Sequence, residues 1–403
     1  LSLWLRDNDF SRSQVGLLSL IGVTYGFNWL WAPLIDRIRI PWLTNKIGHR
    51  RSWIVIMQLI ILLSLVSWGM VNPKENIWIV GLVGLIIAIA SATQDIVTDA
   101  LRIEQVGKTE GQSMSAGAGV MVIGWYTGFK IGKVITLFTA HYLEDFGIQN
   151  YWQITFLLLT TIIIACNIAL MFVSEQRSTE RQIEQKKTDQ IIVDKFGSSN
   201  SISNIVAWIL GTVTGPFITF FKSKGIKIAI YIIIFLFLFK IGEAFLGKMS
   251  IVFYDDMGFS KKQIAIYSGG YGWVITVLFT LIGSFFAIRS GLVKAMIIAG
   301  IMMASTNLLF SALAWYGNSE FLFATAVILD QITESISTVV FVAFVSLLVD
   351  RTYTATHYAL MASLATLGKN VFSAFSGVVV DKLKFLNSPE NLHNDWAIFF
   401  IIT

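Results

Sequence analysis

The feature that most constrains this chain is a series of ten long apolar segments that fill it almost from end to end. A helix needs about 20 apolar residues to cross the hydrocarbon core of a bilayer. Segments of about that length recur here with short polar loops between them. They are residues 15–36, 53–71, 77–101, 114–140, 152–174, 226–247, 263–288, 292–315, 320–349 and 354–380. The sequence therefore predicts an all-α polytopic membrane protein.

The composition excludes a water-soluble fold. The chain is 55% hydrophobic and 14% charged, with a mean hydropathy of +0.68. Soluble domains carry about 25% charged residues. The net charge of +5 is spread over loops, which indicates a lipid bilayer as the surroundings rather than nucleic acid as a partner.

Short apolar stretches at residues 1–5 and 396–403 resemble pieces of further helices. We expect the chain to be a fragment cut inside a first helix and inside a last one. Ten complete helices and two partial ones would make twelve.

Lys and Arg divide the loops into two alternating sets. The set that contains 37–52, 102–113 and 175–225 carries more than twice as many of these residues as the other set. Because basic residues are retained on the cytoplasmic side of a membrane, we expect this set to face the cytoplasm.

Residues 175–225 divide the chain at its centre. Residues 175–200 are polar and mixed in charge, whereas Ile202 to Phe221 has apolar residues at helical spacing, with Lys222, Lys224 and Lys227 after it. This pattern predicts an amphipathic linker helix on the cytoplasmic leaflet. The resulting division is a helix bundle at 1–174, a linker at 175–225 and a second bundle at 226–403, the arrangement of major facilitator transporters.

Ionisable residues inside the apolar segments are the first candidates for function. Each costs about 2.5–3.5 kcal/mol on insertion scales, so it marks a pathway or a structural pair. In the 77–101 segment, Asp95 and Asp99 share a helix face, and Arg102 follows Asp99 by three residues. We predict an Asp99–Arg102 pair. Asp95, with Gln94 beside it, either bonds another helix or serves substrate or protons.

The second half has a similar set of charges. Asp330 and Glu334 lie four residues apart in the 320–349 segment, and Lys369 lies in the next segment. Lys240 and Glu243 are three apart in the 226–247 segment and can pair within one helix. Such a pair either eases insertion or includes a group that titrates. A carboxylate in a low-dielectric environment binds a proton more readily, so Asp95, Asp330, Glu334 and Glu243 are candidates for proton coupling.

Aromatic and basic residues within the segments are candidates for binding a substrate. Trp125, Tyr126, Tyr271 and Trp273 can stack on sugar rings, and Lys240 and Lys369 can pair with carboxylates. Gln94 is a further candidate. The alternative is that the aromatic residues only pack and the lysines only pair with Glu243 and Glu334.

A third group of candidates gathers at the predicted cytoplasmic ends of the first-half helices. This group, which we predict to gate the cytoplasmic side, comprises Asp36, Arg37, Arg50, Arg51, Asp99 and Arg102. We expect Asp36 and the two arginines Arg50 and Arg51 to form part of an inner latch. Partly exposed pairs of this kind contribute about 0–1 kcal/mol each.

Several motifs resemble one family over essentially the whole chain. They are Trp29 to Arg37, Gly48 to Trp53, Ser91 to Asp95 with Asp99, Lys240 to Ala244 and Ala355 to Leu360. These residues resemble AmpG-type muropeptide permeases of the major facilitator superfamily. The first-half motifs are shared with acetyl-coenzyme A transporters, whereas the second-half motifs favour the permeases. Those permeases carry Tyr-Arg at the place where this chain has Trp125-Tyr126. Any substrate contact made by the arginine of those permeases is therefore in doubt for this chain.

The resemblance implies a monomeric, proton-coupled importer of N-acetylglucosaminyl-1,6-anhydro-N-acetylmuramyl peptides in the bacterial inner membrane. It implies a role in peptidoglycan recycling, with no enzymatic activity and no cofactor. The histidines show no metal-ligand spacing. A carrier for acetyl-coenzyme A or another anion is one alternative, and a membrane sensor derived from a transporter is another.

Overall fold

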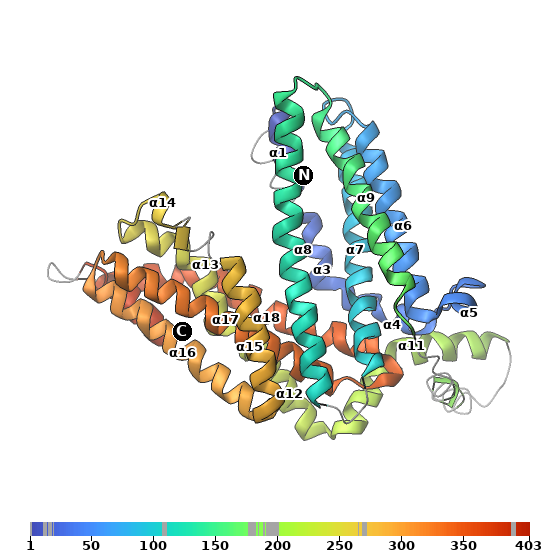
Figure 1. Ribbon diagram of the computed structural model, residues 1–403. Coiled ribbons are helices and arrows are strands. Elements are labelled where there is room, and N and C mark those ends of the chain that lie inside the picture. Colours follow the sequence, from blue (N-terminus) through green and yellow to red (C-terminus); the bar gives the residue numbers. More distant parts are fainter. Residues whose placement is uncertain are drawn as a thin grey trace. The chain divides into compact units, whose positions relative to one another are not determined.

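The computed structural model describes residues 2–10, 14, 18, 20–106, 111–175, 183, 185–187, 190, 201–264, 266–267, 272–387 and 392–403 (Figure 1). Within these residues every regular element is helical. The predicted all-α fold is therefore confirmed for the part of the chain that the structure describes.

Nine described helices or helix pairs are long and apolar enough to cross a membrane. They are α6 (His49–Met70), α7 (Ile77–Gln105), α8 (Gly111–Asp145), α9 (Tyr151–Met171), α12 with α13 (Ile226–Asp256), α15 (Gly272–Ser290), α16 (Leu292–Tyr316), α17 (Glu320–Leu348) and the stretch around α18 (Arg351–Leu386). These nine coincide with nine of the ten predicted segments.

The tenth predicted segment, 15–36, is not one continuous helix in its described part. Short pieces replace it: η1 (Leu20–Val23), α3 (Thr24–Phe27), η2 (Asn28–Leu30) and α4 (Ala32–Arg37). Pro33 near the start of α4 has no N–H group to continue the helix before it. Apolar composition predicts a span but not such interruptions, so the prediction of a single helix was wrong here.

Contacts between Cα atoms group the chain into two compact units. Unit 1 comprises Leu1–Gln105, Ile131–Lys224 and Val349–Ser363, and unit 2 comprises Val106–Lys130, Gly225–Leu348 and Leu364–Thr403. Each unit thus includes a segment from the other side of the 175–225 linker. The division into sequential bundles at that linker stays a prediction.

Unit 1 is built on α6, which packs against α7 and α9. One core cluster joins these helices through Met57, Ile61, Trp68, Trp152 and Phe156. A second cluster joins α4, α6 and α7 to the first turns of α18, through Ala355 and Ala359. The start of α18 (Thr354–Leu383) is therefore part of the core of unit 1.

In unit 2, α17 packs against α15 and α16, and α19 (Asn394–Ile402) packs against α16. Phenylalanine rings dominate its core, with Phe253, Phe310, Phe323 and Phe400 buried. Edge-to-face contacts such as that of Phe253 with Phe400, at 4.8 Å between ring centroids, hold these helices together.

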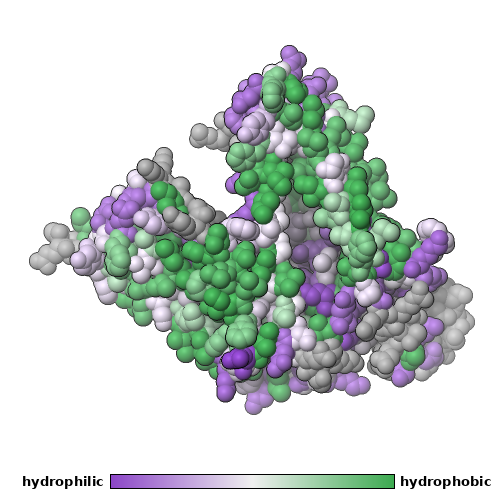
Figure 2. All heavy atoms as spheres, in the orientation of Figure 1, coloured by the Kyte–Doolittle hydropathy of each residue, from purple (hydrophilic) through white to green (hydrophobic). Residues whose placement is uncertain are grey.

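The outward faces of the long helices are apolar. Figure 2 shows hydrophobic side chains along the sides of the helices and hydrophilic ones gathered near many of their ends. Leu63, Leu82, Leu281 and Ile301 are among the exposed apolar residues. Exposed apolar area on this scale is typical of helices that contact lipid.

One close contact in unit 2 predicts a site that is intolerant of any side chain. A Cβ atom at Gly368 of α18 would overlap the backbone carbonyl of Phe237. Because a backbone carbonyl cannot rotate away, we expect Gly368→Ala to destabilise the protein by about 1–3 kcal/mol. The measurement is thermal unfolding of the purified protein in detergent.

Gly377→Ala on the same helix is the matched control. There the nearest atoms are those of the flexible Met249 side chain, at 3.9 Å. Alanine favours a helix over glycine by about 0.5–1 kcal/mol, so this variant should be as stable as the parent or slightly more stable. Equal melting of both variants would contradict the contact at Gly368.

Candidate functional site

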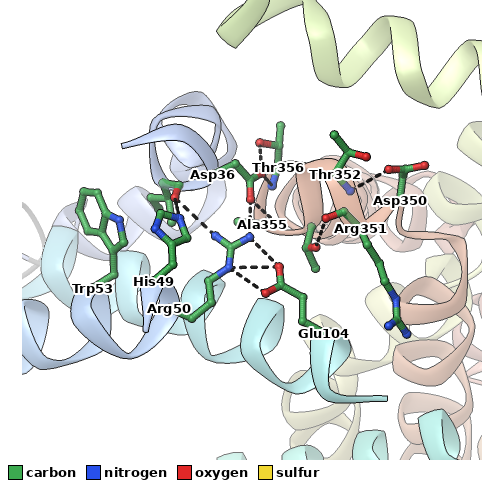
Figure 3. A network of polar contacts seen from close by, with 12 residues as sticks. Asp36, His49, Arg50, Trp53, Glu104, Asp350, Arg351, Thr352, Ala355 and Thr356 are labelled. Carbon is green, nitrogen blue, oxygen red and sulfur yellow. Dashed lines mark hydrogen bonds and ion pairs between the residues drawn. The ribbon is translucent and has the colours of Figure 1, made fainter. Parts of the chain in front are cut away.

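A buried carboxylate in unit 1 joins α4 to the first turn of α18. The Asp36 carboxylate accepts hydrogen bonds from Arg50 Nη2 at 2.6 Å, from the backbone N–H groups of Ala355 at 3.1 Å and Thr356 at 2.8 Å, and from Thr356 Oγ1 at 2.7 Å (Figure 3). The first N–H groups of a helix have no partner within it and attract negative charge. Asp36 therefore caps α18 although it lies more than 300 residues away in the sequence.

Asp36 lies at the end of its own helix that does not favour a carboxylate. Asp36 is in the last turn of α4, where the helix dipole disfavours negative charge. Arg50 and the α18 N-terminus supply the positive charge that its own helix does not. We call Asp36, Arg50, Glu104, Ala355 and Thr356 the Asp36 cluster.

Arg50 is the buried cation of this cluster. Its guanidinium lies 2.6 Å from Asp36 and 2.7 Å from Glu104 of α7, and the Arg50 and Asp36 side chains are both 0% exposed. The sequence predicted partly exposed pairs of low energy, and for this pair that prediction was wrong. Removing one partner of a buried pair costs about 3–5 kcal/mol because the other charge is left unpaired.

The other predicted gate residues lie around the same segment in unit 1. Arg37 donates to the hydroxyl of Tyr353 at 3.3 Å. Asp99 and Arg102 pair at 2.9 Å, as their spacing predicts, and the Arg102 guanidinium lies 5.8 Å from the centre of the Tyr358 ring. Arg37 and Arg102 thus contact aromatic rings of the segment Tyr353 to Tyr358, and Asp99 pairs with Arg102.

Arg51 departs from the prediction. Its side chain donates to the carbonyl of Met171 at 3.3 Å, and Arg50 alone of the two arginines bonds Asp36. The backbone N–H groups of Arg50 and Arg51 bind the carboxylate of Glu175, both at 2.9 Å. Glu175 fits there because Gly48, at φ +104°, has no side chain in the space that the carboxylate fills.

In unit 1, Gln94 and Asp95 occupy different surroundings on α7. Asp95 is exposed, whereas Asp99 one turn later is buried. The side-chain oxygen of Gln94 is buried without a hydrogen-bond partner. An ionisable side chain that is exposed within an apolar span is a candidate for contact with water or substrate.

In unit 2, the predicted 226–247 segment is broken near its centre. α12 (Ile226–Leu238) ends before Phe239, and α13 (Ile241–Asp256) begins after Lys240. The sequence predicted one continuous helix here. A broken helix within a span frees backbone groups and is typical of binding sites in transporters.

Lys240 at this break is part of a charged cluster. Its ammonium group contacts the carboxylate of Glu243 and donates to Ser337 Oγ at 3.2 Å and Thr338 Oγ1 at 2.9 Å. Lys369 of α18 binds the second oxygen of Glu243 at 3.2 Å. We call Lys240, Glu243 and Lys369 the Glu243 cluster.

The two lysines of this cluster differ in their exposure. The side chain of Lys240 is 10% exposed and that of Glu243 is 15% exposed, whereas that of Lys369 is 44% exposed. Lys240 is surrounded by oxygen atoms, so its hydrogen bonds are largely satisfied. Lys369 shares its carboxylate with Lys240 and keeps donors available for another anion.

The two other candidate carboxylates of unit 2 lie on α17. Glu334 accepts from the hydroxyl of Tyr126 at 3.4 Å, and Asp330 accepts from Thr306 Oγ1 at 3.4 Å. Both distances are long for hydrogen bonds to a carboxylate. These two groups are thus less strongly held than Glu243.

The candidate aromatic residues are described only in part. The Trp125 ring is exposed, stacks on Phe129 at 5.7 Å and meets Tyr126 edge-on at 5.0 Å. Trp273 Nε1 lies 3.4 Å from Thr127 Oγ1. Tyr271 lies outside the described residues. Among the described residues, no group of three His, Cys, Asp or Glu side chains is arranged to hold a metal ion.

Comparisons with known proteins identify the kind of molecule. No protein-family model matches the chain. The chain is 27% identical to "Putative transporter AmpG 4" of Rickettsia conorii, over 100% of this chain and 87% of that protein. It is 26% identical to "Anhydromuropeptide permease" of Escherichia coli K12, over 100% of this chain and 72% of that protein.

Solved transporters share the fold. The proton:xylose symporter XylE matches with a TM-score of 0.59 and 13% identity, over 98% of this chain and 86% of that one. The major facilitator transporter FucP, in its outward conformation, matches with a TM-score of 0.63 and 11% identity, over 98% and 89%. The chain is therefore similar to AmpG transporters over its full length and has the major facilitator fold. The printed names of these two relatives describe a transporter and a permease.

Sequence reasoning missed three residues of unit 1. These are Glu104, Glu175 and Gln185. Gln185 donates to the backbone carbonyls of Asp36 at 3.3 Å and Thr352 at 3.1 Å. Glu104 and Glu175 each place a charge at the end of an apolar segment, and this position could have marked them as candidates. Gln185 lies in a polar linker, where no sequence feature distinguishes it from its neighbours.

Proposed function

We propose that this chain imports N-acetylglucosaminyl-1,6-anhydro-N-acetylmuramyl peptides across the bacterial inner membrane together with protons. The printed names of its relatives support the substrate class. The observation that carries the proposal is the half-exposed Lys369, which shares one carboxylate with Lys240 inside the spans. A surplus cation at such a depth suits a substrate that bears carboxylates.

The carboxylates within the spans support proton coupling. Asp330 and Glu334 lie on one face of α17 with weak hydrogen bonds, and Asp95 is exposed on α7. A carboxylate that lacks a firm partner in a low-dielectric environment changes its protonation at small free-energy cost. Each of these carboxylates can therefore bind and release a proton as its access to water changes during the transport cycle.

The Asp36 cluster supports a gating role. It ties α4, α6 and α7 to the start of α18, which belongs to the predicted second bundle. Alternating access moves one bundle against the other around a central site. We infer that these contacts close the cytoplasmic side and break when that side opens.

Uptake into proteoliposomes tests the function directly. The purified protein is reconstituted, and uptake of labelled anhydro-muropeptide is followed with an acidic exterior, with no gradient, and with a protonophore. The expected result is accumulation that requires the gradient and vanishes with the protonophore. Accumulation of acetyl-coenzyme A instead, or uptake that ignores the gradient, would contradict the proposal.

Amide replacements test the coupling. We expect gradient-driven uptake to be abolished by at least one of Asp95→Asn, Asp330→Asn, Glu334→Gln and Glu243→Gln, the last combined with Lys240→Met to keep the protein folded, because an amide cannot carry a proton. Exchange of labelled for unlabelled substrate should survive in that variant. Asp145→Asn, at the exposed end of α8, is the control. If uptake by all four variants depended on the gradient as it does in the parent, the proposal that one of these carboxylates carries the proton would be wrong.

Lys369→Gln tests substrate recognition. A charge-assisted hydrogen bond contributes about 1.5–3 kcal/mol, so its loss should raise the half-saturating concentration of the peptide-bearing substrate about tenfold or more. The peptide-free disaccharide should be affected much less. The measurement is the concentration dependence of uptake for both substrates.

Lys240→Gln is the companion variant, since Lys240 binds the same carboxylate but is buried. It should lower stability and the uptake of both substrates alike. Equal losses for both substrates in Lys369→Gln would instead make Lys369 a structural partner of Glu243.

A further inference from the structure

The linker helix α11 (Ser201–Lys224) ends where the chain enters a membrane span. A single residue, Gly225, separates it from α12 (Ile226–Leu238). Gly225 has φ +76°, a conformation that glycine adopts without strain. The covalent chain therefore keeps the last turn of α11 close in sequence to the start of a membrane span.

One face of α11 is docked within unit 1. Thr212, Gly215, Pro216 and Phe220 recur at helical spacing and are buried. Gly215 packs against Tyr353 so closely that a Cβ atom would lie 2.6 Å from the tyrosine hydroxyl. Position 215 therefore has no room for a side chain beside Tyr353.

A hydrogen-bonded histidine fixes the docked position. The N–H of Asp350 donates to His357 Nδ1 at 3.2 Å, so the ring hydrogen is on Nε2, which donates to the carbonyl of Pro216 at 2.7 Å. The Phe220 ring also meets the His357 ring edge-on, at 5.8 Å. α11 and the start of α18 are thereby coupled through specific contacts.

Several apolar side chains of α11 outside the docked contacts are exposed. Val213 is 54% exposed, Ile218 is 56% exposed and Leu210 is 39% exposed. Lys222 is exposed near the end of the helix, and Lys224 is half-buried. Exposed apolar side chains with lysines beside them are typical of helices that lie in the headgroup region of a bilayer.

Continuity with α12 decides which partner fits this face. Because the next residues enter a membrane span, the lysines are held beside lipid headgroups whatever else binds the protein. Each lysine near an anionic leaflet attracts it, and the attraction falls off within a Debye length. Anionic phospholipid therefore matches both the charge and the position of the surface.

We propose that the exposed face of α11, with Lys222 and Lys224, binds anionic phospholipid headgroups and thereby holds the Asp36 cluster closed. Tyr353 and His357 flank Ala355 and Thr356, whose N–H groups bind Asp36. Arg37, next to Asp36, donates to Tyr353. Lipid that holds α11 docked thus stabilises the same segment that Asp36 caps. The inference rests on the gating role and the cytoplasmic orientation proposed above.

Fluorescence quenching tests the lipid contact without any substrate. Val213→Cys is labelled with bimane in a Cys166→Ser background and reconstituted in mixed phosphatidylcholine and phosphatidylglycerol, with bromine on the acyl chains of one or the other. We expect brominated phosphatidylglycerol to quench about twofold more than brominated phosphatidylcholine, and the preference to fall at high salt.

Charge-matched variants show which lysines act. Lys222→Gln and Lys224→Gln together should remove the lipid preference. Lys382→Gln and Lys384→Gln together lose the same charge from a loop of the other set, and this variant should retain the lipid preference. Equal quenching by both lipids in the parent, or loss of the preference in both double variants, would overturn the proposal. Quenching that instead depends on the protein-to-lipid ratio would assign the face to a second copy and overturn it too.

Spin labels at Lys46 and Lys294 test the link to the gate. Phosphatidylglycerol should raise the fraction of parent molecules whose cytoplasmic side is closed, and it should not change that fraction in the Lys222→Gln/Lys224→Gln variant. A lipid preference without any change in the distances between the spin labels would overturn the link between lipid binding and the Asp36 cluster. Failure of muropeptide uptake would affect neither the quenching measurement nor the distance measurement. The lipid inference and the substrate proposal can thus fail separately.

Discussion

Asp36→Asn is expected to open the cytoplasmic side of the resting transporter and to slow transport. The carboxylate holds Arg50 and two N–H groups of α18 in a fully buried site. An asparagine side chain has one oxygen to accept these hydrogen bonds, and its own N–H groups face N–H donors of Arg50 or α18. Losing one partner of a buried pair costs about 3–5 kcal/mol, and each 1.4 kcal/mol changes a population ratio about tenfold. The ratio of closed to open states should therefore fall at least about a hundredfold.

Distances between spin labels at Lys46 and Lys294, in a Cys166→Ser background, measure this shift. The distribution in Asp36→Asn should move to longer distances, while the affinity of the inward-open state for substrate stays nearly unchanged. Asp350→Asn is the control, because Asp350 caps Thr352 in the same segment but does not contact Asp36. An unchanged distribution in Asp36→Asn would leave Asp36 as a residue that only caps a helix.

The sequence predicted what local spacing determines. Nine spans follow from runs of apolar residues, and the Asp99–Arg102 and Lys240–Glu243 pairs follow from a separation of three residues on one helix. In each case the helix itself fixes the geometry. No knowledge of the tertiary structure is needed to place such residues together.

The contacts of Asp36 could not be predicted in the same way. Nothing in a single sequence relates residue 36 to residues 355 and 356, because their approach depends on how whole helices pack. The role of Glu175 at the start of α6 likewise depends on the empty space at Gly48. The burial of Arg50 was missed for this reason, and with it the strength of the pair.

The breaks within helices were missed for a different reason. Residues 226–247 have no proline, and Gly242 alone is a weak signal because helices tolerate single glycines at a cost of about 1 kcal/mol. Close packing of Gly368 on the carbonyl of Phe237, just before the break, is a tertiary contact. Such contacts override local helix preference, so the interruption at Lys240 appears only in the folded chain.

Glu243→Gln is expected to destabilise unit 2 strongly. It leaves Lys240, with a side chain only 10% exposed, without a counter-ion, and it also removes the partner of Lys369. An unpaired buried charge costs about 3–5 kcal/mol. Thermal unfolding in detergent should show a marked loss of stability in this variant, and little folded protein should be recovered.

Adding Lys240→Met separates folding from transport. The double variant Lys240→Met/Glu243→Gln has no unpaired buried charge, and Lys369 remains half exposed, so its stability should recover to near that of the parent. Gradient-driven uptake should stay impaired, because the carboxylate that orients Lys369 is still missing. Recovery of uptake together with stability would show that the Lys240–Glu243 pair serves only insertion and folding. Proton coupling would then have to reside on Asp95, Asp330 or Glu334.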